Sequence, residues 1–239
     1  MKTPTKQVAI VTGASRGIGK AIALKLKALS YEVVGTYKTS TNKAKEVATQ
    51  GIDMQQANAG SEADTIRVVR HVINTYGQLD LVVNNAGIDT FGNIETYELS
   101  DWNEMVASDL TSVFLMTKYA IPYLKKSDNA CIVNISSRLG LAEYAEPEFA
   151  VYSALKAAVN NFSMALSREL KNDGIRVNVV TPVPTETDLF RQVFTPEDHK
   201  ALIAKGKLGQ PEDVASLVIE LVNDPTANGK MLFDKRVNL

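Results

Sequence analysis

Short runs of apolar residues alternate along the chain with longer segments in which apolar residues recur every three or four positions. The runs are rich in β-branched residues and apolar almost throughout, as are strands that helices cover on both faces of a parallel sheet. We therefore predict a mostly parallel sheet of seven strands. Five are clear, Val8–Val11, Val33–Thr36, Leu79–Val83, Cys131–Ile135 and Val177–Val180, and two are weaker, Met54–Ala57 and Met231–Phe233.

The segments between the runs have the period of amphipathic helices, with one apolar stripe each. Regular alternation of strands and helices, with no break in composition, predicts one doubly wound α/β domain of the Rossmann type over residues 1–239. The residues from Glu186 to Lys207 are expected to form a loop over the ligand pocket. The predicted helices are Ile18–Leu29, Asn42–Gln50, Glu62–Asn74, Trp102–Leu124, Ala150–Lys171 and Pro211–Asn223.

Composition and charge narrow the classes of function. Among 239 residues, 26 Lys and Arg stand against 27 Asp and Glu, so no bulk positive field attracts nucleic acid or an anionic membrane. The single Cys131 cannot form an intramolecular disulfide, and two histidines with one cysteine argue against a zinc site. We expect a metal-free cytoplasmic protein with neither nucleic-acid nor membrane partners.

A glycine-rich loop joins the first predicted strand to the first helix. It reads Thr12-Gly13-Ala14-Ser15-Arg16-Gly17-Ile18-Gly19. Glycine allows a tight turn and a close approach to a pyrophosphate, and the helix that follows offers free N–H groups to the phosphates. The loop taken alone also fits a bare turn, but a strand before it and a helix after it are the context that a dinucleotide site requires.

Tyr152 and Lys156 stand four residues apart and therefore share one face of the predicted helix. They follow the strand that ends at Ser136 and Ser137, and open α/β sheets bind ligands at the carboxyl ends of their strands. We expect the Lys156 ammonium to lower the pKa of the phenol, ordinarily ~10, by roughly 1–3 units. Tyr152 would then exchange a proton with an alcohol or carbonyl oxygen.

The motifs, taken in order, resemble those of the short-chain dehydrogenases/reductases from residue 7 to about residue 233. The Gly-x-x-x-Gly-x-Gly spacing matches the family's first signature, and Asn84-Asn85-Ala86-Gly87 matches its Asn-Asn-Ala-Gly motif. Ile135–Gly140 is similar to the family's serine segment, and Gly209–Ala215 to the start of its late helix. Within the family, the likeness is to the 3-oxoacyl-[acyl-carrier-protein] reductases.

This resemblance implies that Ser137, Tyr152 and Lys156 are catalytic, and that a nicotinamide cofactor occupies the loops after the strands. Asp109 stands where the family has a catalytic asparagine, either as a tolerated replacement or as a carboxylate that stabilises the lysine ammonium. The cofactor residues implied are Gly13, Ser15, Arg16, Gly17, Ile18, Gly19, Thr36, Lys38, Asn58, Asn85, Ala86, Gly87, Tyr152, Lys156, Thr185 and Thr187.

The second strand ends without the acidic residue that NAD-specific sheets use to bind the ribose 2′-hydroxyl. Lys38 lies there instead, and Arg16 is a second cation in the glycine loop. Both attract a 2′-phosphate, so NADP(H) is the predicted cofactor.

Two other parts of the sequence depart from the family's pattern. Val183 replaces a family glycine beside the nicotinamide, and Phe233–Arg236 replaces the usual Asp-Gly-Gly close near the subunit contacts.

We predict an NADP(H)-dependent oxidoreductase that interconverts a carbonyl and an alcohol. Asp128 and Asp173 stand where a reductase for an acidic carrier would need arginines at the site entrance, which favours small ketones or aldehydes. A 3-oxoacyl-[acyl-carrier-protein] reductase is the alternative, and a non-catalytic NADP(H) sensor the rival of another class. The family's tetramer contacts map onto Trp102–Leu124 and Ala150–Lys171, so a homotetramer (or homodimer) is expected, with Trp102 as a packing anchor.

Overall fold

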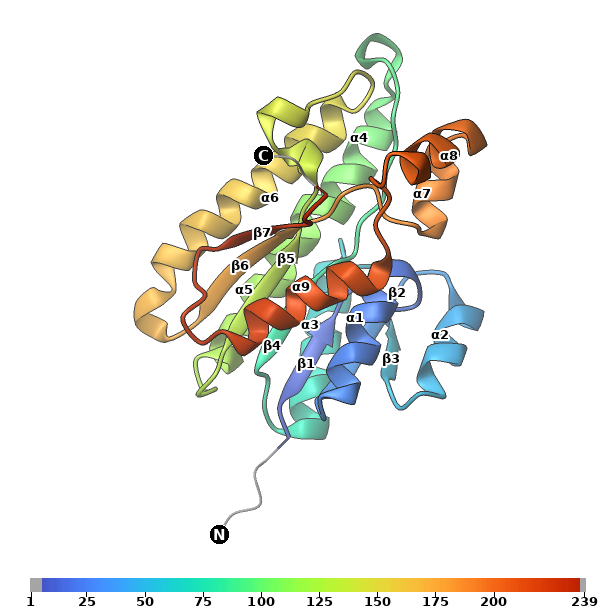
Figure 1. Cartoon of the computed structure of the whole chain (residues 1–239). Helices are drawn as coiled ribbons and strands as arrows, with labels where there is room; N and C mark the ends of the chain where they lie inside the picture. The colour runs from blue at the N-terminus through green and yellow to red at the C-terminus, as the bar shows by residue number, and fades with distance from the viewer. Residues whose placement is uncertain (1–5, 237–239) are drawn as a thin grey trace.

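Within residues 6–236, which the computed structural model describes, seven parallel strands form the centre of the fold (Figure 1). Their spatial order is β3-β2-β1-β4-β5-β6-β7, so the direction of winding reverses between β1 and β4. The predicted sheet is confirmed, including both of the weaker strands. The strands are β1 (Val8–Val11), β2 (Glu32–Tyr37), β3 (Asp53–Gln56), β4 (Leu81–Asn84), β5 (Cys131–Ile135), β6 (Arg176–Thr181) and β7 (Met231–Phe233).

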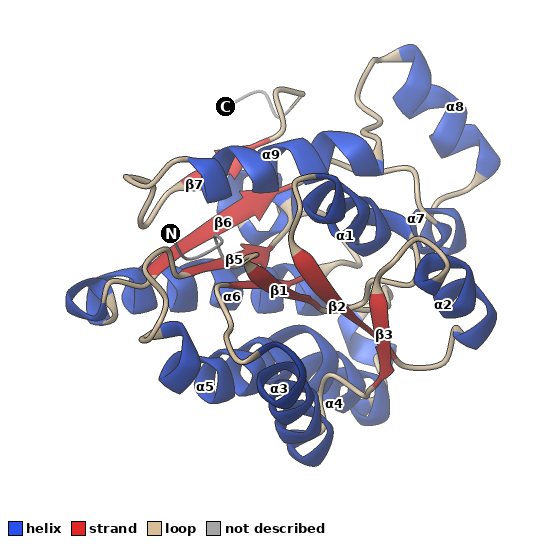
Figure 2. Ribbon diagram, turned by 90° about the horizontal axis from the view of Figure 1, so that it is seen from below, coloured by secondary structure: helices blue, strands red, loops and turns tan. Residues whose placement is uncertain are grey.

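Helices cover both faces of the sheet, which Figure 2 shows from below. In that view α1 and α9 lie on one side of the strands, and α3, α5 and α6 lie on the other. The helices are α1 (Gly17–Ala28), α2 (Thr41–Ala48), α3 (Glu62–Tyr76), α4 (Leu99–Met105), α5 (Ser112–Leu124), α6 (Ala150–Glu169), α7 (Asp188–Val193), α8 (Pro196–Ala204) and α9 (Pro211–Asn223).

The core consists of two apolar layers, one on each face of the sheet. Successive residues of a strand point to opposite faces, so Ala9 packs in the layer of α1 and α9, and Ile10 packs in the layer of α3, α5 and α6. Both residues are fully buried. A sheet covered in this way leaves only its edges and the loops at its strand ends for binding a ligand.

Two predicted segments differ from the structure. Trp102–Leu124 is not one regular helix, because a π-helical segment, Val106–Thr111, separates α4 from α5. Glu186–Lys207 is not an irregular loop, because it contains α7 and α8. A capping box of Thr195 and Asp198 starts α8 and was readable in the sequence. Trp102 is 40% exposed, so its expectation as a packing anchor within the chain is wrong.

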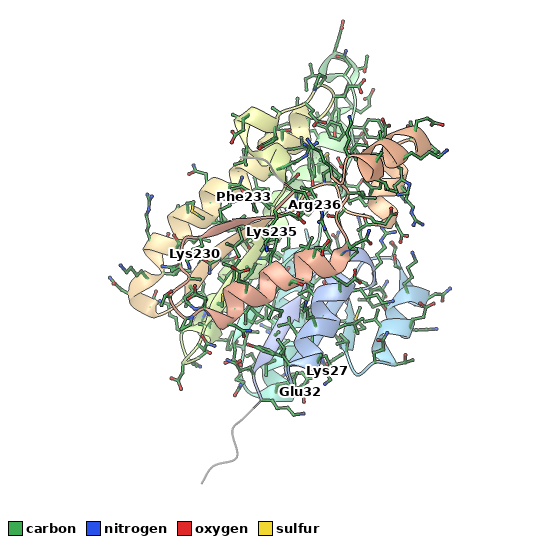
Figure 3. The ribbon with its side chains drawn as sticks, viewed as in Figure 1. Lys27, Glu32, Lys230, Phe233, Lys235 and Arg236 are labelled. Atoms are coloured by element: carbon green, nitrogen blue, oxygen red, sulfur yellow. The ribbon has the colours of Figure 1, made fainter. Side chains whose placement is uncertain are left out.

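The atypical C-terminal segment is tied to the start of α9. Figure 3 shows Lys235 and Arg236 close to Phe233 of β7. The Arg236 guanidinium pairs with Asp213 at 2.7 Å and with Asp234 at 2.8 Å. The chain after β7 is thus held by ion pairs of Arg236, where the family usually has an Asp-Gly-Gly sequence. None of the helices in the described part of the chain is long and apolar enough to cross a membrane.

Candidate active site

A cavity of about 480 Å³ opens at the carboxyl ends of the strands, where the winding reverses between β1 and β4. Such a switch point is where open α/β sheets bind their ligands, and the volume lies within the range of small-molecule and cofactor sites. Every residue that the sequence assigned to catalysis or to the cofactor lines this cavity. The tertiary structure therefore brings the whole predicted set together.

The glycine loop wraps closely around the start of α1. Gly13 has a φ of +68°, in the left-handed region that favours glycine. A Cβ at Gly19 would lie 2.3 Å from the Gly13 carbonyl oxygen, so a side chain there would force the loop apart. No side chain in the described chain caps the amino terminus of α1, and its first turn has no acidic residue. These uncapped N–H groups suit a pyrophosphate.

Asn85 joins the glycine loop to the end of β4. Its side-chain amide donates a hydrogen bond to the Thr12 carbonyl at 2.9 Å. The Thr12 hydroxyl in turn accepts hydrogen bonds from the backbone N–H groups of Asn85 and Ala86, each at 2.9 Å. The Asn-Asn-Ala-Gly motif thus braces the floor of the cavity as well as lining it.

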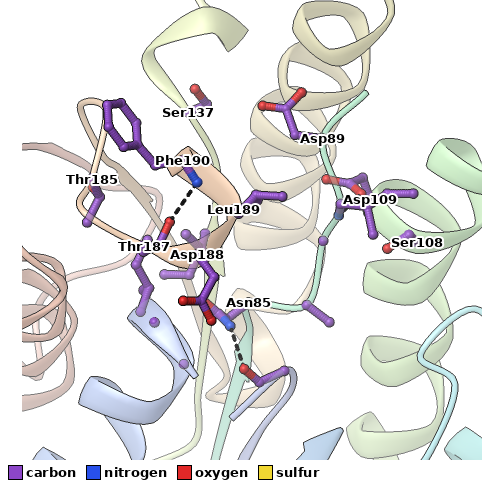
Figure 4. A pocket seen from close by; sticks show the side chains of 18 of the residues that line it. Asn85, Asp89, Ser108, Asp109, Ser137, Thr185, Thr187, Asp188, Leu189 and Phe190 are labelled. Carbon is purple, nitrogen blue, oxygen red and sulfur yellow. Dashed lines mark hydrogen bonds between the residues drawn. The ribbon is translucent and has the colours of Figure 1, made fainter. Parts of the chain in front are cut away.

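Thr185 and Thr187 line the cavity from the segment that leads from β6 to α7. Thr187 caps the amino terminus of α7, and its hydroxyl accepts a hydrogen bond from the Phe190 N–H at 3.1 Å (Figure 4). The Thr185 hydroxyl donates to the Val183 carbonyl at 2.8 Å. Val183 is buried and lines the cavity, so the residue that replaces the family's glycine forms part of this wall.

Both cations predicted to bind a 2′-phosphate have a carboxylate partner that the sequence analysis missed. The Lys38 ammonium lies 3.1 Å from Glu104 of α4. The Arg16 guanidinium lies 3.6 Å from Asp188 of α7, which also contacts Lys43. The partners are far apart in the sequence, by 66 residues for Lys38 and Glu104 and by 145 residues for Lys43 and Asp188. Local sequence spacing therefore could not predict these pairs.

Ser137, Tyr152 and Lys156 meet at the other end of the cavity. Ser137 lies close enough to Tyr152 to lower the pKa of its phenol, whereas the Ser136 hydroxyl donates to the Lys156 carbonyl at 3.2 Å and so braces α6. This division supports the assignment of Ser137 rather than Ser136 to the site. The Lys156 ammonium lies 5.3 Å from the centre of the Tyr152 ring, as expected for residues one helical turn apart.

Asp109 lies in the π-helical segment and forms a buried ion pair with Lys156, at 2.9 Å. Its Oδ1 accepts a hydrogen bond from the Ile88 N–H at 2.9 Å. Gly87 makes room for the carboxylate, because a Cβ there would lie 2.7 Å from Asp109 Oδ2. Of the two interpretations left open by the sequence, the geometry favours a carboxylate that stabilises the lysine ammonium.

Burial and the neighbouring carboxylates determine the proton affinities of the pair. Burial by itself lowers the pKa of Lys156, but the charges of Asp109 and Tyr152 outweigh it, and the pKa is higher than usual. Burial raises the pKa of Tyr152 to about 12, and the Lys156 charge only partly opposes it. The expectation of a lowered tyrosine pKa is therefore wrong for the protein alone, because burial outweighs the charge of Lys156 and the carboxylates of Asp89 and Asp109 oppose that charge further.

Asp89 is a further site residue that the sequence analysis missed. It follows the Asn-Asn-Ala-Gly motif by two positions and lines the cavity. Burial and the charge of Asp109 raise its pKa to about 7. Phe149, Phe190 and Phe194 form an apolar wall at the same pocket. The only signal in the sequence for Asp89 was a carboxyl group two residues after the motif.

The expectation about Asp128 and Asp173 is wrong in its geometry. These residues precede β5 and β6, whereas the catalytic residues follow the carboxyl ends of the strands. In a parallel sheet the two sets of residues lie at opposite ends of the strands, so Asp128 and Asp173 do not flank the entrance of their own chain's pocket. Asp173 pairs there with Lys125 at 2.9 Å.

Comparisons with known proteins agree with this geometry. The family model for short chain dehydrogenases matches residues 7–198. A 3-oxoacyl-[acyl-carrier-protein] reductase of Synechocystis is 36% identical over 95% of this chain and 93% of its own. Two solved structures each cover 97% of both chains with a TM-score of 0.87. They are a variant short-chain dehydrogenase/reductase of Serratia marcescens, at 31% identity, and a short chain dehydrogenase of Burkholderia cenocepacia in complex with NADP, at 29%.

A doubly wound sheet with a dinucleotide-type loop and a Ser-Tyr-Lys cluster at its switch point defines a nucleotide-dependent oxidoreductase fold. The chain belongs to the short-chain dehydrogenase/reductase family. It resembles the 3-oxoacyl-[acyl-carrier-protein] reductases among the members of that family.

Proposed function

We propose that the protein is an NADP(H)-dependent oxidoreductase that interconverts a small ketone or aldehyde with the corresponding alcohol. The observation that carries the proposal is the meeting of Ser137, Tyr152 and Lys156 in the same cavity as the glycine loop. When bound, the nicotinamide supplies or accepts the hydride. The chain itself has to bind the substrate oxygen and exchange a proton with it.

Tyr152 is the proton donor and acceptor in this proposal. Its hydroxyl is buried beside Ser137, which leaves both groups able to hydrogen-bond one substrate oxygen. In the reductive direction the protonated phenol donates its proton to the oxygen of the forming alcohol. A pKa of about 12 keeps the phenol protonated at neutral pH, which favours this direction. Lys156 positions the proton transfer by its charge and orients the ribose, and Asp109 holds Lys156.

Replacing Tyr152 with phenylalanine tests this role directly. Tyr152→Phe is expected to bind NADPH as the unmodified protein does and to lose most of its turnover with every ketone. Fluorescence titration of NADPH and oxidation of NADPH measured by absorbance give the two readouts. An unmodified protein that binds NADP(H) and turns over no member of a broad carbonyl panel would instead be a nucleotide sensor.

NADP(H) is proposed over NAD(H) because Arg16 and Lys38 both line the cavity and β2 ends without a carboxylate. If each charged contact contributes roughly 1.5–3 kcal/mol, the two together give at least about a hundredfold preference. Lys38→Asp combined with Arg16→Ser is expected to reverse it. Equal kcat/KM for NADH and NADPH in the unmodified protein would refute the assignment.

A 3-oxoacyl-[acyl-carrier-protein] reductase is the second candidate, because the curated relatives carry that name. An acidic carrier needs an excess of positive charge near the site. The charged residues that line this cavity are four basic and five acidic, which favours a small substrate instead. Steady-state kcat/KM for a carrier-bound 3-oxoacyl thioester, compared with that for small ketones, decides between the two.

We also propose that the chain acts as a homotetramer in the cytoplasm. Leu99 and Trp102 of α4 and Phe114 of α5 are exposed, at 71%, 40% and 47% of their surface. These helices are the ones that resemble the family's subunit contacts, so a second copy would cover their apolar side chains. Light scattering at micromolar concentration is expected to give the mass of four chains, or of two for a dimer, and a monomer would contradict the proposal.

A further inference from the structure

The charges that line the cavity are almost all matched in pairs. Each of its four basic side chains lies within 4 Å of a carboxylate that also lines the cavity. The pairs are Arg16 with Asp188, Lys38 with Glu104, Arg138 with Glu146, and Lys156 with Asp109. Asp89 is the fifth carboxyl group of the lining, and it is in no ion pair or hydrogen bond with a side chain or backbone group in residues 6–236.

This unmatched carboxyl group lies in the catalytic part of the cavity. Its Oδ1 is buried without a hydrogen-bond partner, and its charge reaches both Tyr152 and Lys156. In Figure 4 the carboxylate of Asp89 is turned toward the side of the pocket on which Ser137 lies. A buried polar group without a partner is costly and rare. A partner supplied by the substrate would remove that cost at the reacting end of the pocket.

Three aromatic rings form an apolar wall in the same cavity. Phe149 stacks on Phe194 with ring centres 6.3 Å apart, and Phe194 stacks on Phe190 at 4.6 Å. All three rings line the cavity. A flat or aliphatic group would replace water against this wall. The cavity thus offers an apolar wall and an unpaired carboxyl group, together with Ser137 and Tyr152.

We propose that Asp89 determines substrate specificity by accepting a hydrogen bond from an ammonium or hydroxyl group next to the reacting carbon of the substrate. The Phe149–Phe190–Phe194 wall holds an apolar group on the other side of that carbon. The proposal rests on the carbonyl–alcohol oxidoreductase activity proposed above and names the class of substrate for the same site. A substrate carboxylate near the carbonyl would be disfavoured, because it would face Asp89. A protonated or ionised Asp89 accepts from a hydroxyl, and the ionised form pairs with an ammonium.

Three ketones that share a phenyl ring test the proposal with NADPH. Acetophenone has no donor beside the carbonyl, phenacyl alcohol has a hydroxyl there, and phenacylamine has an ammonium. The readout is the ratio of kcat/KM for each donor-bearing ketone to kcat/KM for acetophenone. A charge-assisted hydrogen bond corresponds to a factor of about 10 to 100. The phenacylamine ratio is therefore expected to fall by about that factor in Asp89→Asn, which removes the charge.

A second variant separates the two donors. Asp89→Leu removes the acceptor entirely, so the ratios for phenacylamine and phenacyl alcohol are both expected to fall. Asp89→Asn retains an amide oxygen and is expected to spare most of the phenacyl alcohol ratio. Asp128→Asn makes the same change of charge at an exposed position near the amino ends of the strands, away from the pocket. It is expected to leave both ratios unchanged.

Ratios that stay the same in both Asp89 variants would overturn the proposal while leaving the oxidoreductase activity intact. A fall for the hydroxyl ketone alone would assign the donor as a hydroxyl, and a fall for the ammonium ketone alone would assign it as an amine. Should neither variant fold, competitive inhibition of the unmodified enzyme decides: phenethylamine must then bind more tightly than ethylbenzene. Turnover of none of the three ketones by an unmodified protein that reduces other carbonyl compounds would overturn this inference alone. Turnover of no member of the broad carbonyl panel, with NADPH bound, would refute the proposed function as well.

Discussion

In the proposed mechanism, the ion pair between Asp109 and Lys156 influences the pH at which the protein can oxidise an alcohol. Oxidation needs Tyr152 in its phenolate form, and its pKa is raised to about 12 by burial, with a contribution from Asp109. Asp109→Asn keeps an oxygen that can accept from the Ile88 N–H but removes the negative charge beside Lys156. We expect the substitution to lower the pKa of Tyr152.

The size of the effect follows from the position of the lysine. A unit charge 5.3 Å from the Tyr152 ring contributes about 3 kcal/mol at an effective dielectric constant of ~20, which equals about 2 pKa units. Asp109 lies only 2.9 Å from that charge and cancels much of it. Removing the carboxylate should therefore lower the pKa of Tyr152 by about 1–2 units.

The assay is the pH profile of kcat/KM for alcohol oxidation with NADP⁺. In the unmodified protein the logarithm of kcat/KM is expected to rise with pH across the whole range in which the protein is folded. In Asp109→Asn the inflection is expected about 1–2 units lower, and kcat/KM for ketone reduction should decline from the same pH. Asp101→Asn, an exposed change on α4, is the control for charge and should not move the profile.

Folding must be measured in parallel, since Lys156 then lies buried without an ionised partner. Loss of one member of a buried pair costs about 3–5 kcal/mol when nothing replaces it, and the asparagine oxygen should reduce that cost. Circular dichroism melting separates this loss from the effect on the pH profile. A folded Asp109→Asn protein whose oxidation profile superimposes on that of the unmodified protein would refute the reasoning.

Two further predictions concern carboxylates of the cavity. Glu104→Gln frees Lys38, and since exposed pairs contribute about 0.2–1 kcal/mol, the Kd for NADPH should fall by about 1.4- to 5-fold while that for NADH stays the same; an unchanged Kd for NADPH in a titration would show that Glu104 does not compete with the 2′-phosphate. Asp89 has its pKa raised from 3.8 to about 7 in the folded protein, so its contribution to stability is present below pH 4 and is lost as the pH rises through 7. Asp89→Asn should thus gain up to about 4 kcal/mol over the unmodified protein between pH 4 and pH 8 in urea unfolding, and a difference that does not vary with pH would contradict the assignment.

Local sequence patterns determined the sheet, most of the helices and the identity of the main site residues. The seven strands were predictable because strands of a parallel sheet covered on both faces are apolar almost throughout. The glycine loop and the pair Tyr152 and Lys156 were predictable because the residues of each motif are close together in the sequence. The π-helical segment around Asp109 was not predictable from hydrophobic periodicity. The apolar pattern of Trp102–Leu124 predicted one continuous helix, whereas in the structure the π-helical segment places the Asp109 carboxylate against Lys156 and Gly87.

Only the tertiary structure decided how the charges of the site are matched. Lys38 pairs with Glu104 and Arg16 with Asp188 through contacts between segments far apart in the chain, whereas Asp89 has no ion-pair partner among the described residues. The proton affinity of Tyr152 also depends on its burial and on all its charged neighbours, so one lysine four residues away cannot fix its direction. Spacing along a chain specifies which groups share a helix face, whereas electrostatic balance depends on every group that folding brings within a few ångströms.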